Sequence, residues 1–285
     1  MRHFYVVMNP DKEGARETSE AICRYLAGHG ADCVIGKSDK KENQPGSHYT
    51  DSSVVPENTD CIITLGGDGT LIQAARDLAG RNIPILGINR GTLGYLTQIS
   101  RSEEMDQALS ALISGDYKLE ERMMLDGTVR RRGEPIFCDI ALNEIVIIRN
   151  EHLKVLKFKV YVNGEYFNEY RADGLIAATP TGSTAYNLSA GGPILVPDSK
   201  MVALTPICSH VLGTRSIVLS SDDCIQVEML GQDEICQAAV FDGDTQIRLY
   251  PGDIIEIGRS EIKTILVKLK NISFLDNLRN KMTGI

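Results

Sequence analysis

The chain has 285 residues, of which 42% are hydrophobic and 24% are charged, and its formal net charge is -8. This balance is typical of a globular protein with one large or two modest domains, and it argues against nucleic acid or an anionic membrane surface as the main partner. The seven cysteines show no paired ligand spacing and the five histidines lie far apart, which disfavours a disulfide framework or a zinc site. With no signal peptide and no apolar run of membrane-spanning length, we expect a cytoplasmic protein.

The first hundred residues alternate strand patterns with helix patterns. Helical spacing of apolar residues at 13–26 and 71–79 alternates with apolar runs at 4–10, 31–36, 61–67 and 83–89. This alternation predicts a parallel sheet covered by helices. The polar segment 37–60 contains Pro45 and Pro56 and has no apolar period, so it predicts a mobile loop that is long enough to be a lid.

The pattern changes to strands after a predicted helix over 102–115. The apolar segments that we interpret as strands are 118–125, 138–149, 157–171, 174–180, 216–221, 224–230, 246–258 and 262–269. Asn163-Gly164 predicts a hairpin whose turn needs positive φ at both positions. This second region is therefore expected to be mostly antiparallel, and the tail at 273–282 returns to helical character.

The stretch "LGGDGT" joins the predicted strand at 61–65 to the helix that follows. Gly66, Gly67 and Gly69 let the backbone approach a ligand, and the amides at the start of a helix favour an anion such as phosphate. Asp68 is unexpected there because a carboxylate repels phosphate. It is explained if it holds a metal ion or accepts a proton during a reaction.

Three further segments stand out. "GINRGTLGYLT" (87–97) places Gly87, Gly91 and Gly94 after a strand, which suits a ligand crevice or a linker between domains equally well. Asn143-Glu144 lies in an apolar strand, so at least one side chain faces the core or a site, although an exposed pair on an edge strand is the simpler alternative.

The third segment, 170–193, carries a dense run of small, hydroxylated and glycine residues that suits a polar ligand, with Tyr186 offering a ring for stacking. A flexible surface loop is the alternative. By contrast, "VFDGDTQ" around Asp242 predicts a hairpin turn with Gly243 in positive φ. Arg130–Arg132 predict a solvated turn, and we interpret His210 as a structural residue because no nucleophile motif adjoins it.

Taken together and in this order, "LGGDGT", "GINRGTLGYL", "LNEIVI" and "DGLIAATPTGSTAYNLSAGGP" resemble bacterial NAD kinases over most of the chain. "GGDGT" alone is shared with lipid kinases and sugar phosphofructokinases. The resemblance implies a Rossmann-like α/β domain over 1–98, which binds nucleotide, and a β-rich NAD-binding domain over 99–271, with the active site between them. We expect the tail 272–285 to pack back on the first domain.

The resemblance also implies an activity and its residues. The implied activity is transfer of the γ-phosphate of ATP to the 2'-hydroxyl of the adenosine ribose of NAD, giving NADP. In this reaction Asp68 takes the proton of the hydroxyl, and Mg²⁺ enters with ATP. The implied assembly is a homodimer or homotetramer. Phosphate is expected at Gly66, Gly67 and Thr70. The residues expected to contact NAD are Gly69, Asn143, Glu144, Lys154, Arg171, Asp173, Thr184, Ala185, Tyr186, Asn187, Leu188 and Ser189.

Two positions depart from the family pattern: Asp244 stands where a glutamine is frequent, and Tyr95-Leu96 replaces a pair that often contains Phe. A lipid kinase is the nearest rival, but the acidic composition does not suggest a membrane-facing surface. A non-catalytic NAD-binding regulator is the rival of another class. Turnover measured beside NAD binding distinguishes such a regulator from a kinase.

Overall fold

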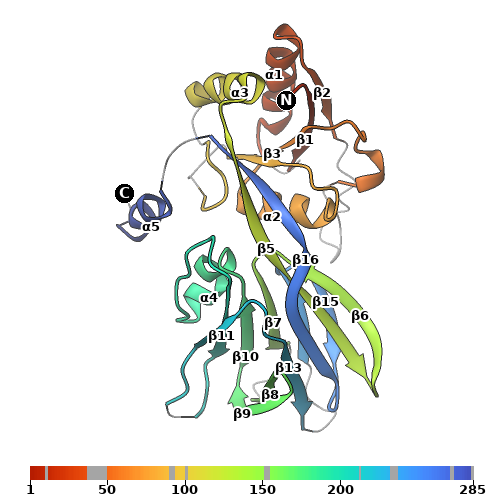
Figure 1. Cartoon of the computed structure of the whole chain (residues 1–285), viewed down its shortest axis with the longest axis vertical. Helices are drawn as coiled ribbons and strands as arrows, with labels where there is room; N and C mark the ends of the chain where they lie inside the picture. Colours follow the sequence, from red (N-terminus) through yellow and green to blue (C-terminus); the bar gives the residue numbers. More distant parts are fainter. Residues whose placement is uncertain are drawn as a thin grey trace. The chain divides into compact units, whose positions relative to one another are not determined.

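The computed structural model describes residues 1–9, 12–36, 50–89, 94–99, 102–150, 155–211, 213–231, 237–269 and 273–283 (Figure 1). The chain divides into two compact units. The first contains residues 1–122 and 263–285, and the second contains residues 123–262. The first unit is therefore built from both ends of the chain.

The first unit holds a parallel sheet with the strand order β2-β1-β3-β4-β16. The central strands β1, β3 and β4 are short, apolar and mostly buried, as expected of a parallel sheet with both faces covered. Their bounds are β1 His3–Met8, β2 Asp32–Ile35, β3 Cys61–Leu65, β4 Ile85–Ile88 and β16 Ile254–Lys268. The predicted alternation of strands and helices in this part of the chain is confirmed.

Helices cover both faces of this sheet. Leu26 of α1 (Ala15–Gly28) and Leu109 of α3 (Met105–Ser114) share one apolar cluster with Val6 and Ile63, which point to one side of their strands. The helix α2 (Asp68–Asp77) contacts β3 and β4 but contributes nothing to that cluster, so it covers the other face. Figure 1 shows the same arrangement, with α2 below the strands and α1 and α3 above them. Short 3-10 helices occupy Ser52–Val54 and Ser102–Glu104.

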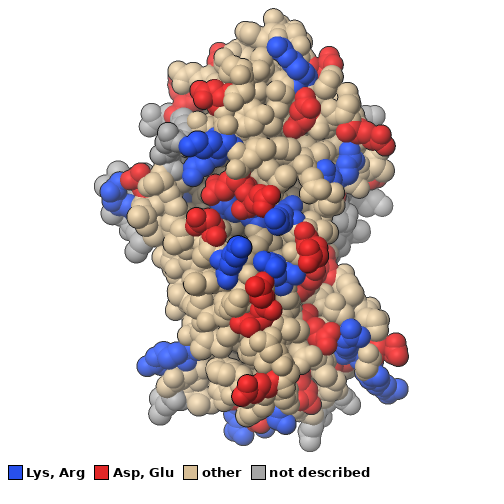
Figure 2. All heavy atoms as spheres, in the orientation of Figure 1, with Lys and Arg blue, Asp and Glu red and all other residues tan. Residues whose placement is uncertain are grey.

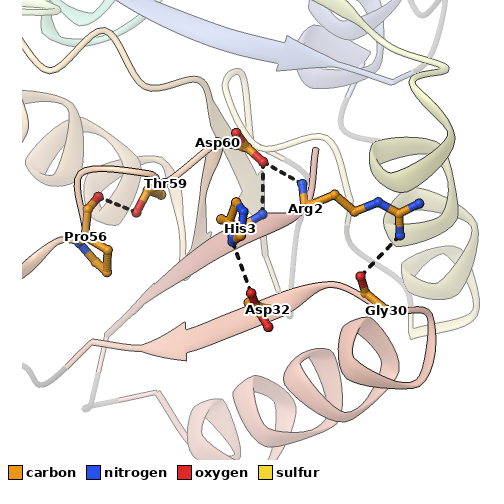
Figure 3. Close-up of polar contacts among 7 residues, drawn as sticks. All are labelled: Arg2, His3, Gly30, Asp32, Pro56, Thr59 and Asp60. Atoms are coloured by element: carbon orange, nitrogen blue, oxygen red, sulfur yellow. Dashed lines mark hydrogen bonds and ion pairs between the residues drawn. The ribbon is translucent and has the colours of Figure 1, made fainter.

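The N-terminal end of β1 is fixed by the residue that precedes β3. The Asp60 carboxylate accepts the backbone amides of Arg2 at 2.6 Å and His3 at 3.0 Å (Figure 3). Partial burial raises the pKa of Asp60, but these two amides and the nearby positive charges outweigh it and lower the pKa overall. His3 Nδ1 also lies 3.2 Å from the Asp32 carboxylate at the start of β2. The three strands are thus joined at this end by side chains as well as by their ladder.

A disulfide joins Cys23 on α1 to Cys33 on β2, whose Cα atoms lie 5.2 Å apart. The expectation of cysteines without disulfides is wrong for this pair. Helix α1 turns back directly into β2, which brings together two residues separated by ten positions. Cys61, Cys138, Cys208 and Cys224 are free.

The second unit is antiparallel apart from its short helices, as predicted. In one sheet β16 pairs with β13 (Ile225–Leu230), which pairs with β8 (Leu156–Val162), which pairs with β9 (Glu165–Ala172). Asn163 and Gly164 both have positive φ, 52° and 79°, so the predicted hairpin turn between β8 and β9 is confirmed. The hairpin of β5 (Lys118–Arg131) and β6 (Glu134–Ala141) joins this sheet through β16.

The other sheet has six strands in the order β12-β11-β10-β7-β14-β15. Among the described residues, 22 buried ones, including Phe158 and Phe241, form the core between the sheets. The bounds are β7 Glu144–Arg149, β10 Gly174–Ala178, β11 Met201–Ile207, β12 Ile217–Ser220, β14 Gln237–Phe241 and β15 Thr245–Leu249. Both sheets are needed to bury this core.

Several predicted boundaries are wrong. The segment 138–149 is two strands, β6 and β7, because the chain bends at Leu142 and Asn143. Strands β11 and β14 were not predicted, and the two segments predicted at 246–258 and 262–269 instead form β15 and one 15-residue strand, β16. The solvated turn predicted at Arg130–Arg132 is limited to Arg132 and Gly133, since Arg130 pairs with Glu256 at 2.6 Å and Arg131 with Asp253 at 2.8 Å.

Acidic and basic side chains are interspersed on the face shown in Figure 2, which fits the modest net charge. Within the described residues, no helix is both long and apolar enough to cross a bilayer. The predicted C-terminal helix is present as α5 (Phe274–Thr283). The predicted domain limits and the packing of the tail stay predictions.

Candidate functional site

Asp68 is the first residue of α2, and the segment 94–97 surrounds its carboxylate with donors. Oδ1 accepts the backbone amides of Leu96 at 3.1 Å and Thr97 at 3.0 Å, and the Thr97 hydroxyl at 3.2 Å. Oδ2 accepts the Tyr95 amide at 2.7 Å. Partial burial and then the charge of Asp68 raise the pKa of the Tyr95 phenol. The carboxylate is therefore held in one orientation, with Oδ1 more fully occupied than Oδ2.

The glycines of this region serve two different purposes. A Cβ on Gly94 would lie 1.9 Å from Asp68 Oδ1, and one on Gly87 would lie 2.8 Å from Leu71 and 2.9 Å from Thr97, so both residues allow close packing. Gly66 allows the buried Thr70 side chain to approach in the same way. A Cβ on Gly67 or Gly69 would instead meet open space. The backbone at these two positions is accessible to a ligand, while the Thr70 side chain is covered. Gly91 lies outside the described residues.

The pair Asn143-Glu144 is buried in the second unit, with 9% and 7% of each residue exposed. Strand β7 lies between β10 and β14, so the alternative of an exposed edge-strand pair is wrong. The Asn143 carbonyl accepts the Thr179 amide at 2.8 Å, and the Leu142 carbonyl accepts the Thr179 hydroxyl. A Cβ on Gly182 would lie 2.1 Å from the Asn143 carbonyl oxygen. The loop after β10 thus rests directly on the backbone of the pair.

Asp242 binds the same backbone from the other side. Its Oδ2 accepts the amide of Leu142 at 2.7 Å, and its Oδ1 accepts the amides of Asn143 at 2.7 Å and Glu144 at 3.0 Å. Asp242 and Gly243 have φ of 50° and 71°, so the predicted hairpin turn is confirmed. The sequence predicts only a turn residue at Asp242, because nothing local indicates that its carboxylate meets a segment 100 residues earlier.

Glu144 has unusual electrostatics. Burial, and then the negative charge of Asp242, raise the pKa of Glu144 to about 8. Its Oε2 is buried and has no hydrogen-bond partner among the described residues, and the same holds for Oγ1 of Thr181 in the loop after β10. Buried polar atoms are normally paired, so two unpaired ones on adjoining segments point to a polar ligand or to water.

Buried side chains and their hydrogen bonds hold the loop after β10 in place, which argues against the alternative of a flexible surface loop. Ser183 is fully buried; its hydroxyl donates to the Pro180 carbonyl at 2.7 Å and accepts the Leu195 amide at 2.9 Å. Asn187, also fully buried, donates to the carbonyls of Ser183 and Pro193 and accepts the Thr205 hydroxyl at 2.7 Å. The side chain of Asn187 is therefore used inside the loop. These contacts fix the short helix α4 (Tyr186–Ser189).

The other predicted residues of this segment are more accessible. Tyr186 and Leu188 are 38% and 36% exposed, Ser189 is exposed, and Thr184 and Ala185 are partly exposed. The Tyr186 ring is free to stack on a planar group. Arg171 is exposed on β9, whereas the Asp173 carboxylate pairs with Arg149 at 3.0 Å. Lys154 lies outside the described residues.

No group of three or more His, Cys, Asp or Glu side chains in the described part of the chain is arranged to hold a metal ion. Asp68 is the acidic group of the GGDGT turn, and its carboxylate already accepts four hydrogen bonds. The accessible backbone at Gly67 and Gly69 suits an anion that binds as a complex with a cation.

The comparisons with known proteins agree with one another. The ATP-NAD kinase N-terminal domain model matches residues 4–117, and the ATP-NAD kinase C-terminal domain model matches residues 142–269. An NAD kinase of Lachnospira eligens is 45% identical over 295 residues, which cover 99% of this chain and 100% of that protein. An NAD kinase of Agathobacter rectalis is 41% identical, and the match covers 99% of each chain.

Two solved structures share the fold. A yeast NADH kinase complexed with NADH superposes with a TM-score of 0.85 at 25% identity, covering 100% of this chain and 88% of that one. An NAD kinase from Archaeoglobus fulgidus in complex with ATP superposes with a TM-score of 0.76 at 27% identity, covering 100% of both chains.

Proposed function

Because the chain belongs to the ATP-NAD kinase family, its activity is that of an ATP-NAD phosphotransferase, and we propose that Asp68 is the residue that receives the proton. The reaction joins the 2'-hydroxyl oxygen of the adenosine ribose of NAD to the γ-phosphorus of ATP. The bond from that phosphorus to the ADP oxygen breaks, and the products are NADP and ADP. One proton leaves the hydroxyl and needs an acceptor.

The hydrogen bonds of Asp68 support this role and indicate which oxygen acts. A carboxylate oxygen has two lone pairs, and Oδ1 already accepts three donors while Oδ2 accepts one. Oδ2 therefore keeps the capacity to accept the hydroxyl proton. A ribose hydroxyl is a very weak acid, so transfer occurs late, as the bond to phosphorus forms.

The remaining predicted residues are assigned roles according to their exposure and hydrogen bonds. We assign phosphate binding to the backbone of Gly67 and Gly69, at the positive end of the α2 helix dipole, and packing roles to Gly66, whose amide donates to the Ile88 carbonyl at 3.0 Å, and to Thr70. In the second unit, we assign NAD contacts to Asn143, Glu144, Thr184, Ala185, Tyr186, Leu188 and Ser189. Asn187 acts by holding their loop, and Lys154, Arg171 and Asp173 keep the contacts implied by the family resemblance.

A divalent cation, Mg²⁺ in our proposal, enters with ATP and offsets the charge on its phosphates. The GGDGT turn has no Lys or Arg to do so. We also propose that the chain works in the cytoplasm and forms a homodimer or homotetramer. This assembly is the one that the family resemblance implies.

The deciding experiment incubates the purified chain with NAD, ATP and Mg²⁺ and detects NADP with an NADP-specific dehydrogenase. We expect NADP from the wild type and a loss of about 100-fold to 10,000-fold in kcat for Asp68→Asn, with NAD binding by calorimetry largely intact. Asp77→Asn removes the same charge from the other end of α2 and serves as the control. Turnover near the wild-type rate in Asp68→Asn would exclude Asp68 as proton acceptor.

A further inference from the structure

We propose that Asp242 is a positioning residue of the NAD site, because its carboxylate fixes the backbone from which Asn143 and Glu144 present their side chains. The proposal rests on the proposed function of that pair. The contacts of Asp242 with three successive amides, at 2.7, 2.7 and 3.0 Å, carry the inference.

The geometry is specific to this point of the fold. Strand β7 begins at Glu144, and the bend at Leu142 and Asn143 leaves their amides outside the regular ladder. Unpaired amides inside a protein are costly, so they need an acceptor. Asp242 supplies it from the end of β14, where Phe241 pairs with Ile145 and the Asp242 amide itself donates to the Glu144 carbonyl at 3.1 Å. A carboxylate that gathers three amides is a strong, charge-assisted clamp.

The same carboxylate also acts on Glu144 through space. Burial and the charge of Asp242 both raise the pKa of Glu144, so Glu144 keeps its proton at neutral pH when no ligand is present. A carboxyl group that carries a proton can both donate and accept hydrogen bonds, as recognition of a ribose hydroxyl requires. Asp242 is the titratable group that affects Glu144 from the neighbouring hairpin.

Asp242→Asn tests the idea with little change of shape. Asparagine tolerates the left-handed conformation at φ 50°, and its Oδ1 can still accept two of the amides. Its NH₂ group, however, faces the Leu142 amide and cannot accept from it. Asp223→Asn is the matched control, since Asp223 also accepts a backbone amide at a turn of the second unit, that of Ser220 at 2.9 Å.

We expect Asp242→Asn to raise KM for NAD about tenfold, the effect of losing one charged hydrogen bond, with little change in KM for ATP. The pH dependence of kcat/KM for NAD reports groups of the free enzyme, and the step due to Glu144 is expected to move about one pH unit lower. Combining Asp242→Asn with Glu144→Gln should abolish that shift. Asp223→Asn should match the wild type in both measurements.

Hydrogen exchange at the amides of residues 142–144 gives a readout that needs no NAD. Faster exchange there in Asp242→Asn, but not in Asp223→Asn, supports the clamp even if the chain proves inactive with NAD, so failure of the proposed function is recognised separately. An unchanged KM with an unshifted pH profile would overturn the proposal, as would a uniform loss of kcat with no shift. If Asp242→Asn does not fold, Asp242→Gly, which also allows positive φ, replaces it.

Discussion

Thr97 binds the carboxylate of Asp68 twice, with its backbone amide at 3.0 Å and its hydroxyl at 3.2 Å from the same oxygen, Oδ1. The Thr97 hydroxyl also accepts the Gly94 amide at 2.9 Å, and Thr97 is 1% exposed. One hydroxyl therefore joins the loop to the acidic residue that we assign to proton transfer. Removing it should loosen the orientation of Asp68 without removing the carboxylate.

Thr97→Val keeps the size of the side chain and the backbone bond but deletes the hydroxyl. We expect kcat to fall about tenfold and the free energy of unfolding to fall by about 1 kcal/mol, since the Gly94 amide loses its acceptor. Steady-state kinetics and thermal melting measure the two effects. Thr59→Val is the control, because it removes a hydroxyl that bonds Pro56 in the same unit (Figure 3). An equal loss of kcat in both variants would contradict the role given to Thr97.

Gly94→Ala should be far more damaging to catalysis. The new methyl group would lie 1.9 Å from Asp68 Oδ1 and 2.4 Å from Thr97 Oγ1, so the loop or Asp68 must move. A displacement of about 1 Å at a reacting group commonly costs about 100-fold in kcat. Gly28→Ala, where the added methyl meets nothing within 4 Å, should leave kcat unchanged. Full activity in Gly94→Ala would show that the position of Asp68 does not limit the reaction.

The titration of Glu144 makes stability depend on pH. Its pKa is about 8 in the folded chain against 4.5 when unperturbed, because of burial and then Asp242. Between these pH values the unfolded chain loses a proton that the folded chain keeps, so the stability associated with Glu144 is full below 4.5 and declines as pH rises through 8. Glu144→Gln should therefore gain stability relative to wild type as pH rises, by at most about 1.4 kcal/mol per unit.

Thermal melting of the ligand-free proteins across this pH range measures the effect. Glu165→Gln, at an exposed position of β9, should follow the wild type at every pH. A difference in Tm between Glu144→Gln and wild type that stays constant with pH would mean that Glu144 is ionised in the folded chain.

Asn187→Ala should weaken NAD binding through the loop rather than through a lost ligand contact. It removes two donated bonds and leaves the buried Thr205 hydroxyl without its acceptor, at a cost of about 2 to 4 kcal/mol. Melting temperature and the Kd for NAD should change together. Gln246→Ala, an exposed amide on β15, is the control for stability. A weaker Kd with an unchanged Tm would instead indicate direct contact between Asn187 and NAD.

Local patterns predicted the first unit well, because its strands are short apolar runs followed by helices with regular spacing. The same reasoning missed β11 and β14, whose sequences "MVALTPI" and "QAAVF" lack the alternation of a half-buried strand since both are almost wholly buried. The sequence pattern also predicted β6 and β7 as one continuous strand across Leu142, because Asp242, the residue that stabilises the bend, is distant in sequence.

The candidate site shows the same difference between local motifs and contacts that are distant in sequence. Short motifs pointed to Asp68, Asn143 and Glu144 as candidate site residues, because their residue types already suggest a chemistry. The partners that orient them, Thr97 and Asp242, could not be found in this way, since turn-like and loop-like sequences give no sign of which distant carboxylate or amide they meet. The sequence likewise gives no sign that the Asn187 side chain is already fully hydrogen-bonded, because only the fold brings Thr205 to it.

The strand β16 has a consequence for how the chain is made. It runs from Ile254 to Lys268 and supplies the last strand of the parallel sheet, where Leu266 pairs with Ile85. A ribosome releases residue 85 long before residue 266, so β4 waits with an unpaired edge while the whole second unit emerges and folds. We expect nascent chains that end before β16 to need a chaperone.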